Sequence, residues 1–306
     1  MKFCLISPLQ TYGPWRTAGN EIRAWAHALM GDVHCGTDID DYNKFSDYDV
    51  IMIELTSNML PVVIELRLHF TGKLIGLVEG NLVPDWGPII YPTYLQALDV
   101  LDTVGIINPK AYDIFTAITS TPVRFIGIPY PVAWARDNVD LNSTNLLELG
   151  SSPVDSRGGF YNLAVYKHSK IPGVTYVRDD QEKILVEQLL VDVPITTHQM
   201  TDWQTYFKQH STYHVGVHLD HRATWGRYPL DCAAAGIPCV STIGSYTQTI
   251  LFPELTVVHY EIGRAQQLVA RLYNDAVFYD RIVRYARDQL PYFDLQPTAQ
   301  RFLNLL

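Results

Sequence analysis

Short apolar runs alternate with amphipathic stretches along almost the whole chain. In the first half, five runs have the length and apolar content of buried strands: Lys2–Ser7, Asp49–Leu55, Lys73–Val78, Thr103–Ile107 and Val123–Ile128. The stretches between them have the spacing of apolar residues that is typical of helices: Glu21–Leu29, Leu60–Phe70, Tyr94–Leu101 and Lys110–Ile118. Strands that alternate with helices in this way indicate a parallel sheet of the doubly wound kind.

The same alternation begins again after a polar, proline-containing stretch. We expect further strands at Asn145–Gly150, Val174–Val177, Val193–Thr197, Tyr213–Leu219, Cys239–Thr242 and Leu255–Tyr260. We expect helices at Gly159–Ser169, Gln181–Leu190 and Thr201–His210, another within residues 225–238, and a last one over Arg264–Leu290. The pattern therefore predicts an α/β protein of two doubly wound, Rossmann-like domains that face each other across a cleft. Residues 1–130 form the first domain, 131–144 the linker and 145–306 the second, and the last helix belongs to the second domain or returns to the first.

Length and composition fit this organisation. A chain of 306 residues accommodates two domains of roughly 140 residues each. The net charge of −9 argues against a broad nucleic-acid-binding surface, although it leaves a local basic groove open. The N-terminal residues MKFCLISPLQ do not have the form of a signal peptide, and no apolar stretch approaches the roughly 18 residues of a membrane span. The four cysteines form no Cys-x-x-Cys pair and are expected to be reduced thiols, so we expect a cytoplasmic protein.

One stretch carries a specific pattern. Residues 223–240 read ATWGRYPLDCAAAGIPCV: a glycine, an acid, a run of small residues, a Gly-Ile-Pro turn and a short strand. This stretch resembles the signature E-G-F-G-x-x-x-x-E-A-x-A-x-G-x-P-V-V of GT-B glycosyltransferases of the "group 1" type, which include sucrose- and glycogen-synthase-like enzymes. The residues in register are Gly226, Asp231, Ala233, Gly236, Pro238 and Val240.

Two further stretches are similar to the same family. The run LLELGSSPVDSRGG, residues 146–159, looks like the first strand and phosphate loop of the family's nucleotide-sugar domain. In the first half, the glycine-containing loop at residues 11–19 and the run NEIRAWAHAL resemble the start of the family's first helix more loosely. The resemblance covers nearly the whole chain and is most specific over residues 145–250.

The resemblance implies that the protein transfers a sugar from a nucleotide-diphosphate donor to an acceptor, without a metal or a cofactor. A helix N-terminus offers free N–H groups to the diphosphate, and glycine lets the backbone approach it closely. Arg157 is expected to bind phosphate oxygens and Asp231 the ribose hydroxyls. The complete set of donor-binding residues that the resemblance implies is Gly13, Arg157, Gly158, Arg222, Thr224, Trp225, Gly226, Arg227 and Asp231.

Each of these residues also has a simpler interpretation. Asp231 could be a first-turn acid that stabilises its helix, Arg157 a solvated loop residue, and Gly13 part of a strand-to-helix turn. The run HVGVHLDH suggests a metal site, but His214 and His218 would lie roughly 13 Å apart on a strand, too far to share an ion. We therefore predict no metal site.

The chain departs from the family pattern at the groups nearest to the chemistry. Ala223 stands where the family has the glutamate that contacts the donor sugar, and Asp220, His221 and Arg222 lie beside this position. Of these, Asp220 is our candidate to replace the missing acid. Glu79, in the run LVEGN, stands where the family tends to have a catalytic histidine. It is a candidate base toward the acceptor hydroxyl, with a structural carboxylate as the alternative.

These departures leave more than one function open. The first hypothesis is a glycosyltransferase, and the second is a catalytically weakened nucleotide-sugar-binding module or partner subunit of the same fold. A two-domain binding protein of the periplasmic type is a third, disfavoured because the chain shows one linker and no signal peptide. Neither the acceptor nor retention or inversion of configuration follows from the sequence. The acidic charge and the lack of an amphipathic basic helix give no strong nucleic-acid or membrane signal.

Overall fold

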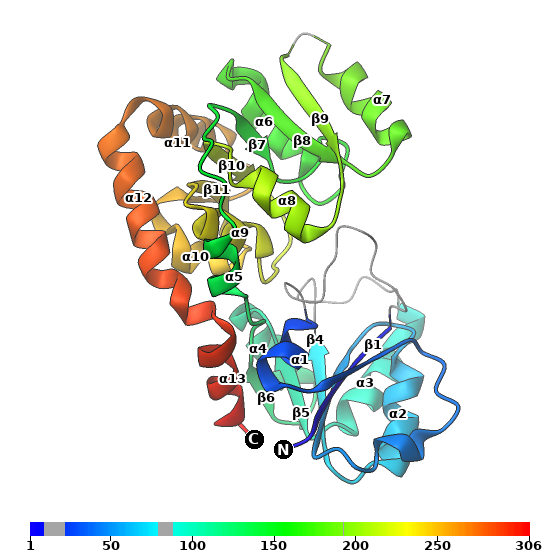
Figure 1. The fold of residues 1–306 in the computed structure, drawn as a ribbon. Coiled ribbons are helices and arrows are strands. Elements are labelled where there is room, and N and C mark those ends of the chain that lie inside the picture. Colours follow the sequence, from blue (N-terminus) through cyan, green and yellow to red (C-terminus); the bar gives the residue numbers. More distant parts are fainter. Residues whose placement is uncertain (9–21, 79–87, 192) are drawn as a thin grey trace. The chain divides into compact units, whose positions relative to one another are not determined.

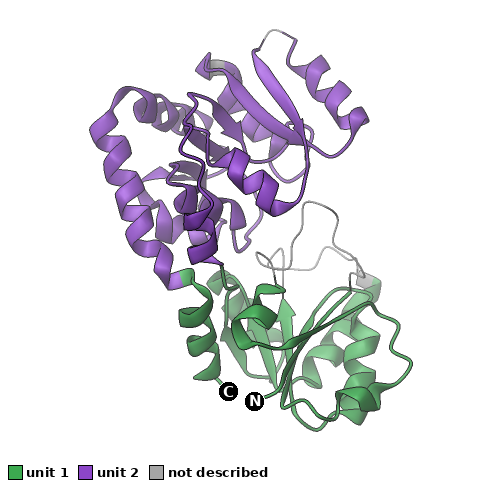
Figure 2. Cartoon of the chain, in the orientation of Figure 1, with its two compact units in different colours: residues 1–12, 18–130, 293–306 green, residues 13–17, 131–292 purple. Residues whose placement is uncertain are grey.

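The chain divides into two compact units, which Figure 2 shows in different colours. The computed structural model describes residues 1–8, 22–78, 88–191 and 193–306. Within these ranges, the first unit holds the residues up to 130 together with 293–306, and the second unit holds 131–292. Each unit contains its own six-stranded parallel sheet. The predicted α/β class with two doubly wound sheets is confirmed.

The sheet of the first unit has the strand order β2-β1-β3-β4-β5-β6 (Figure 1). Its strands are β1 (Phe3–Ser7), β2 (Asp32–Cys35), β3 (Val50–Glu54), β4 (Lys73–Val78), β5 (Thr103–Ile106) and β6 (Val123–Phe125). All residues of β1 and β3 are buried. Apart from Ser7 and Glu54 at their carboxyl ends, these strands are apolar, as is expected where helices cover both faces of a parallel sheet.

Helices cover both faces of this sheet. They are α1 (Ala24–Leu29), α2 (Leu60–His69), α3 (Tyr91–Asp99), α4 (Tyr112–Ile118) and α13 (Leu295–Leu303). On one face, the ring of Phe302 in α13 lies 5.0 Å from that of Trp25 in α1 and 6.4 Å from that of Phe3. On the other face, Ile6 and Ile51 belong to a core that α2, α3 and α4 complete.

The sheet of the second unit has the order β12-β11-β10-β7-β8-β9. Its strands are β7 (Leu147–Leu149), β8 (Gly173–Val177), β9 (Ile195–Gln199), β10 (Val215–His218), β11 (Cys239–Thr242) and β12 (Thr256–Val257). Its helices are α5 (Val132–Asp137), α6 (Gly159–Ser169), α7 (Asp180–Leu189), α8 (Trp203–His210), α9 (Arg227–Ala235), α10 (Tyr246–Leu251), α11 (Ile262–Asn274) and α12 (Ala276–Gln289). Helix α6 packs on α11, whereas α5, α8, α10 and α12 all contact α9. The buried alanines Ala233 and Ala234 allow this close packing around α9.

Several elements differ from the sequence expectation. Strand β2 was not predicted because its residues, DVHC, are only partly buried and form no apolar run. Helix α5 lies inside the predicted linker, and α10 and α13 are also additional. The expected long helix over Arg264–Leu290 is two helices, because Asp275 ends α11 and its carboxylate accepts a hydrogen bond from Phe278 N (2.9 Å) at the start of α12.

All four cysteines are free, and Cys4, Cys232 and Cys239 are buried. Burial, together with the nearby Asp32 carboxylate, raises the pKa of the Cys4 thiol to about 12, so this thiol stays protonated. In the part of the chain that the structure describes, no helix combines the length and apolar character needed to cross a bilayer.

Candidate functional site

The sheet of the second unit has a topological switch point between β7 and β10. These two strands are neighbours in the sheet. Beyond β7 the sheet continues with β8 and β9, and beyond β10, on the other side, it continues with β11 and β12. Loops that leave the carboxyl ends of two such strands diverge, and α/β proteins bind ligands in the crevice between them. The loop after β7 carries two of the predicted donor-binding residues, and the loop after β10 carries most of the others. The structure thus brings together Arg157, Gly158, Asp220, Arg222, Thr224, Trp225 and Gly226.

The loop after β7 lies directly against the end of β10. Gly158 has φ +139°, and a Cβ atom there would lie 2.2 Å from the carbonyl oxygen of Leu219. Only glycine fits this position, because both the backbone conformation and the available space exclude a side chain. Asn162 in α6 fixes the same contact, since its Oδ1 accepts from Leu219 N (2.7 Å) and its Nδ2 donates to Ser151 Oγ (2.8 Å).

Arg157 occupies the last position before this glycine. Its backbone N–H donates to Asp155 Oδ1 (2.6 Å), which closes a tight turn and holds the loop. The Arg157 side chain is exposed. The backbone of the loop is therefore held in place, and the exposed guanidinium is accessible to a phosphate group.

Asp220 and Arg222 form an ion pair in the loop after β10. Arg222 donates from Nε to Oδ1 (3.1 Å) and from Nη2 to Oδ2 (2.8 Å), and its backbone N–H also donates to Oδ1 (2.9 Å). Burial acts to raise the pKa of Asp220, but the Arg222 hydrogen bonds outweigh it, so the pKa lies below its usual value. Both carboxylate oxygens thus hold Arg222. The catalytic role of Asp220 stays a prediction, and the ion pair must open before this carboxylate can act as a base.

The rest of this loop is hydrogen-bonded to the loop after β11. Thr224 N donates to Gly244 O (3.1 Å), and Thr224 O accepts from Tyr246 N (3.1 Å). The buried indole of Trp225 stacks on Tyr246, with ring centroids 5.5 Å apart. Trp225 is therefore part of the support of the loop, and its predicted contact with the donor stays a prediction.

Gly226 is the last residue of this loop and directly precedes helix α9. The residue has φ +88°, and a Cβ atom there would lie 1.8 Å from Ser245 Oγ. Its carbonyl oxygen accepts a hydrogen bond from Thr247 Oγ1. Only glycine allows the chain to enter the helix here, and the first-turn N–H groups of α9 begin at Arg227.

Asp231 lies one turn into α9 and points into the interior of the unit. The residue is 1% exposed, and its Oδ1 accepts a hydrogen bond from Trp203 Nε1 in α8 (3.1 Å). Its Oδ2 lies 3.6 Å from Arg227 Nε. The Trp203 ring in turn packs at a tilt against Trp134 of α5, with ring centroids 4.6 Å apart. In this structure Asp231 links α9 to α8, and its predicted contact with a ribose stays a prediction.

We predict that Asp231→Asn separates these two roles. An asparagine oxygen can still accept from the Trp203 indole, so the variant should fold and lose little thermal stability. If the carboxylate also binds ribose hydroxyls, nucleotide affinity should fall about tenfold or more, because charged hydrogen bonds are worth about 1.5–3 kcal/mol. Calorimetric titration and thermal melting measure both quantities. Trp203→Phe is the control, since it removes the indole donor and keeps the carboxylate; unchanged affinity of Asp231→Asn would leave only the structural role.

Two predicted residues fall outside the described ranges. Gly13 and Glu79 lie in the segments 9–21 and 79–87, so the donor-binding role of the first and the catalytic role of the second stay predictions. In the described residues, no group of three or more His, Cys, Asp or Glu side chains is placed to hold a metal ion.

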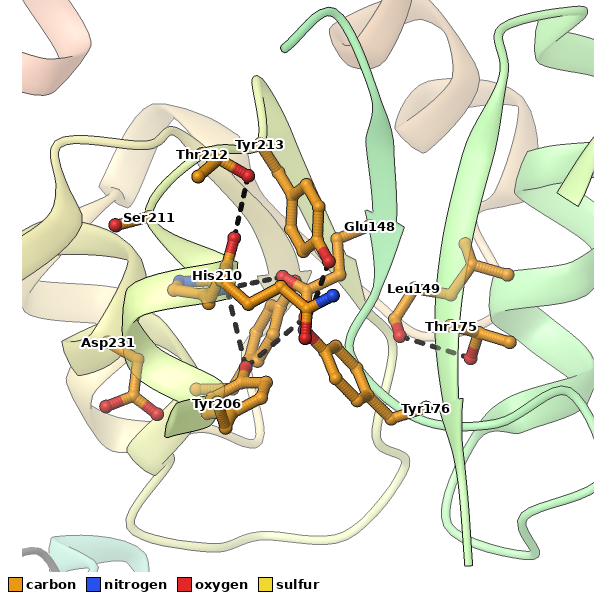
Figure 3. A network of polar contacts seen from close by, with 12 residues as sticks. Glu148, Leu149, Thr175, Tyr176, Tyr206, His210, Ser211, Thr212, Tyr213 and Asp231 are labelled. Carbon is orange, nitrogen blue, oxygen red and sulfur yellow. Dashed lines mark hydrogen bonds and ion pairs between the residues drawn. The ribbon is translucent and has the colours of Figure 1, made fainter. Parts of the chain in front are cut away.

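A buried polar network that the sequence did not predict joins β7, α8 and α9 (Figure 3). Glu148 of β7 is 1% exposed and His210 of α8 is fully buried, and Oε2 of Glu148 lies 2.5 Å from Nδ1 of His210. Tyr228 in the first turn of α9 donates to the same oxygen (2.8 Å), and Tyr206 donates to Oε1 (3.3 Å). The only signal in the sequence was a glutamate within the apolar run LLELG.

The charge state of this network follows from its contacts. Burial alone lowers the pKa of His210, but the Glu148 carboxylate raises it well above its usual value. His210 is therefore protonated at neutral pH and forms a buried ion pair. The Tyr228 side chain packs directly on the backbone of both β10 and the residue after β7. A Cβ atom at Gly150 would lie 2.7 Å from its ring, and one at Gly216 would lie 2.6 Å from its hydroxyl oxygen. The network thus holds the first turn of α9 against the two strands of the switch point.

Known structures resemble the chain over its whole length, although no protein-family model matches it and no curated protein shows significant sequence similarity. Sucrose-phosphate synthase from Thermosynechococcus elongatus has a TM-score of 0.76 at 15% identity, covering 100% of this chain and 98% of that one. α,α-Trehalose 6-phosphate synthase from Burkholderia multivorans has a TM-score of 0.73 at 12% sequence identity, and the match covers 99% of this chain and 97% of that one. A structure described as trehalose-6-phosphate from E. coli bound with UDP-2-fluoro glucose has a TM-score of 0.69 at 13% sequence identity. The match covers 99% of this chain and 98% of that one. The chain therefore has the GT-B fold that its sequence predicted.

Proposed function

We propose that this GT-B protein is a glycosyltransferase that transfers a sugar from a nucleotide-diphosphate donor to an acceptor hydroxyl. The observation that carries the proposal is the meeting of the β7 and β10 loops at the switch point of the second unit. There Gly158 precedes helix α6, Gly226 precedes helix α9, and the exposed Arg157 stands beside them. The likeness to sugar-phosphate synthases, including one structure with UDP-2-fluoro glucose, supports the same substrate class.

These residues suit the chemistry of such a donor. Breaking the bond between sugar and diphosphate leaves negative charge on the departing phosphate oxygen. Arg157 and the first-turn N–H groups of α6 and α9 would stabilise this charge. Arg222, held by Asp220, adds a second guanidinium at the same edge. We propose that these groups allow transfer without a metal ion.

A second candidate is a protein of this fold that binds a nucleotide sugar without transferring it. Ala223 favours it, because alanine cannot make the donor-sugar contact that the resemblance assigns to an acid at this position. The ion pair between Asp220 and Arg222 favours it as well, since it occupies the acid closest in sequence.

Thermal-shift titration with UDP-, GDP-, ADP- and dTDP-sugars, followed by measurement of nucleoside diphosphate release, tests both candidates. A glycosyltransferase should be stabilised by one nucleotide class and should release the diphosphate of that donor. Stabilisation without release, with glycan, lipid, protein, small-molecule and nucleic-acid acceptors supplied, supports the binding module. No stabilisation by any donor would contradict both.

We predict that Arg157→Ala weakens binding of the nucleoside diphosphate about tenfold or more and leaves binding of the bare nucleoside unchanged. The reason is that, in the proposed complex, the guanidinium would contact only the phosphates. Calorimetric titration with both ligands measures the difference. Arg284→Ala is the matched control, because Arg284 is an exposed arginine on α12. Equal losses of affinity for both ligands would show that Arg157 does not bind the phosphates.

A further inference from the structure

His218 is the last residue of β10, one of the two strands that border the switch point. Side chains alternate along a strand, so its imidazole lies on the same face as Gly216, the face that α9 covers. The ring centroid lies 5.2 Å from that of Tyr228. Ser241 Oγ donates to His218 O (2.6 Å), which fixes the backbone at this position. The imidazole is thus held at the edge where the two loops diverge.

The two nitrogens of this ring have different surroundings. Nδ1 is buried and makes no hydrogen bond with any residue in the described part of the chain, whereas the side chain as a whole is only partly buried. A buried N–H without an acceptor is rarer and more costly than a buried lone pair without a donor. The neutral ring should therefore carry its proton on Nε2, the nitrogen at the exposed edge.

Charged residues of both loops surround the ring. Burial lowers the pKa of His218, and Arg222 and Arg157 lower it further, whereas Asp220 and Asp155 act in the opposite direction. The imidazole is therefore neutral at pH 7. A neutral ring that lies within the electrostatic influence of two arginines offers a hydrogen-bond donor and adds no third positive charge to the site.

We propose that His218 is a donor-contacting residue whose Nε2–H binds a diphosphate oxygen of the nucleotide sugar. This inference rests on the proposed function, and it adds a residue that the family signature does not contain. Tyr228 acts as a positioning residue: its ring packs beside the imidazole, and its hydroxyl is held by Glu148.

The test compares two substitutions of His218. His218→Phe keeps a ring of similar size and removes the N–H, so affinity for the nucleotide sugar should fall on the order of tenfold. His218→Gln places an amide N–H near the position of Nε2 and should restore most of that affinity. The probe is whichever of UDP-, GDP-, ADP- and dTDP-glucose binds the unaltered protein, and the corresponding bare nucleoside should bind all variants equally. His214→Phe, the same substitution before the amino end of β10, is the matched control.

Each outcome decides the inference. Loss in His218→Phe with recovery in His218→Gln, for the nucleotide sugar only, supports it. Equal affinity of all variants, or equal losses for nucleoside and nucleotide sugar, overturns it and leaves the proposed function standing. If no nucleotide sugar binds the unaltered protein, the inference and the proposed function both fail.

Discussion

Replacing His210 with leucine is expected to lower the free energy of unfolding by about 3–5 kcal/mol. The histidine is fully buried, and its Nδ1 lies 2.5 Å from Glu148 Oε2. Leucine fills similar space but leaves the buried Glu148 carboxylate without its cation. Among the residues that the structure describes, the hydroxyls of Tyr228 and Tyr206 are then the side-chain donors that remain to it. Urea unfolding followed by circular dichroism measures the loss.

The size of this loss should depend on pH. Glu148 raises the pKa of His210 in the folded state well above the value of about 6.5 expected in the unfolded chain. The stabilisation by the protonated ring is therefore fully present below about pH 6.5 and disappears as the pH rises through the folded-state pKa. The difference between His210→Leu and the unaltered protein should shrink from pH 6 toward pH 9. A loss that stays constant over this range would contradict a charged histidine.

A double variant provides the control for this ion pair. Changing Glu148 to leucine in the His210→Leu background removes the uncompensated charge, so part of the lost stability should return. The recovery should be incomplete, because Tyr228 and Tyr206 lose the acceptor for their hydroxyl groups. A double variant less stable than His210→Leu would show that the carboxylate is not the source of the cost.

Gly158→Ala should both destabilise the second unit and abolish binding of the nucleotide sugar. A Cβ atom there would lie 2.2 Å from the carbonyl oxygen of Leu219, just after central strand β10, and the φ of +139° disfavours alanine in any case. Backbone strain and overpacking each cost about 1–3 kcal/mol, so a loss of about 2–5 kcal/mol is expected in urea unfolding. Binding should be lost because the loop that carries Arg157 must move away from β10.

Gly263→Ala is the matched control for this substitution. Gly263 is the second residue of α11, and a Cβ atom there would meet no more distant part of the described chain within 4 Å. Alanine is the better helix former, so this variant should gain about 0.5–1 kcal/mol and bind the donor normally. A Gly158→Ala protein as stable and as active as Gly263→Ala would refute the close contact between the loop and β10.

Elements with a strong apolar period could be predicted from the sequence, and weakly patterned ones could not. The runs at β3 and β4 were recognised because every residue of β3 and nearly all of β4 are buried. Strand β2 is half-exposed, and α5 and α10 have six residues each, too few for a clear period. Helix α13 packs on α1, which lies at the opposite end of the chain, and no local pattern predicts that contact.

The sequence by itself determined the two alternations of strand and helix, and with them the two doubly wound sheets, because burial of strands and helix faces follows from local periodicity. The GT-B fold was implied by the resemblance of residues 223–240 to the family signature. The sequence also marked Gly158 and Gly226 as candidate site residues, but the tertiary structure showed why each must be glycine, since a Cβ atom would meet Leu219 O at the first position and Ser245 Oγ at the second. Only the tertiary structure decided which polar groups meet. Asp231 accepts from Trp203, 28 positions away, and His210 pairs with Glu148, 62 positions away. Such pairs depend on which strands become neighbours, and strand order is set by packing of the whole unit, which no local pattern records.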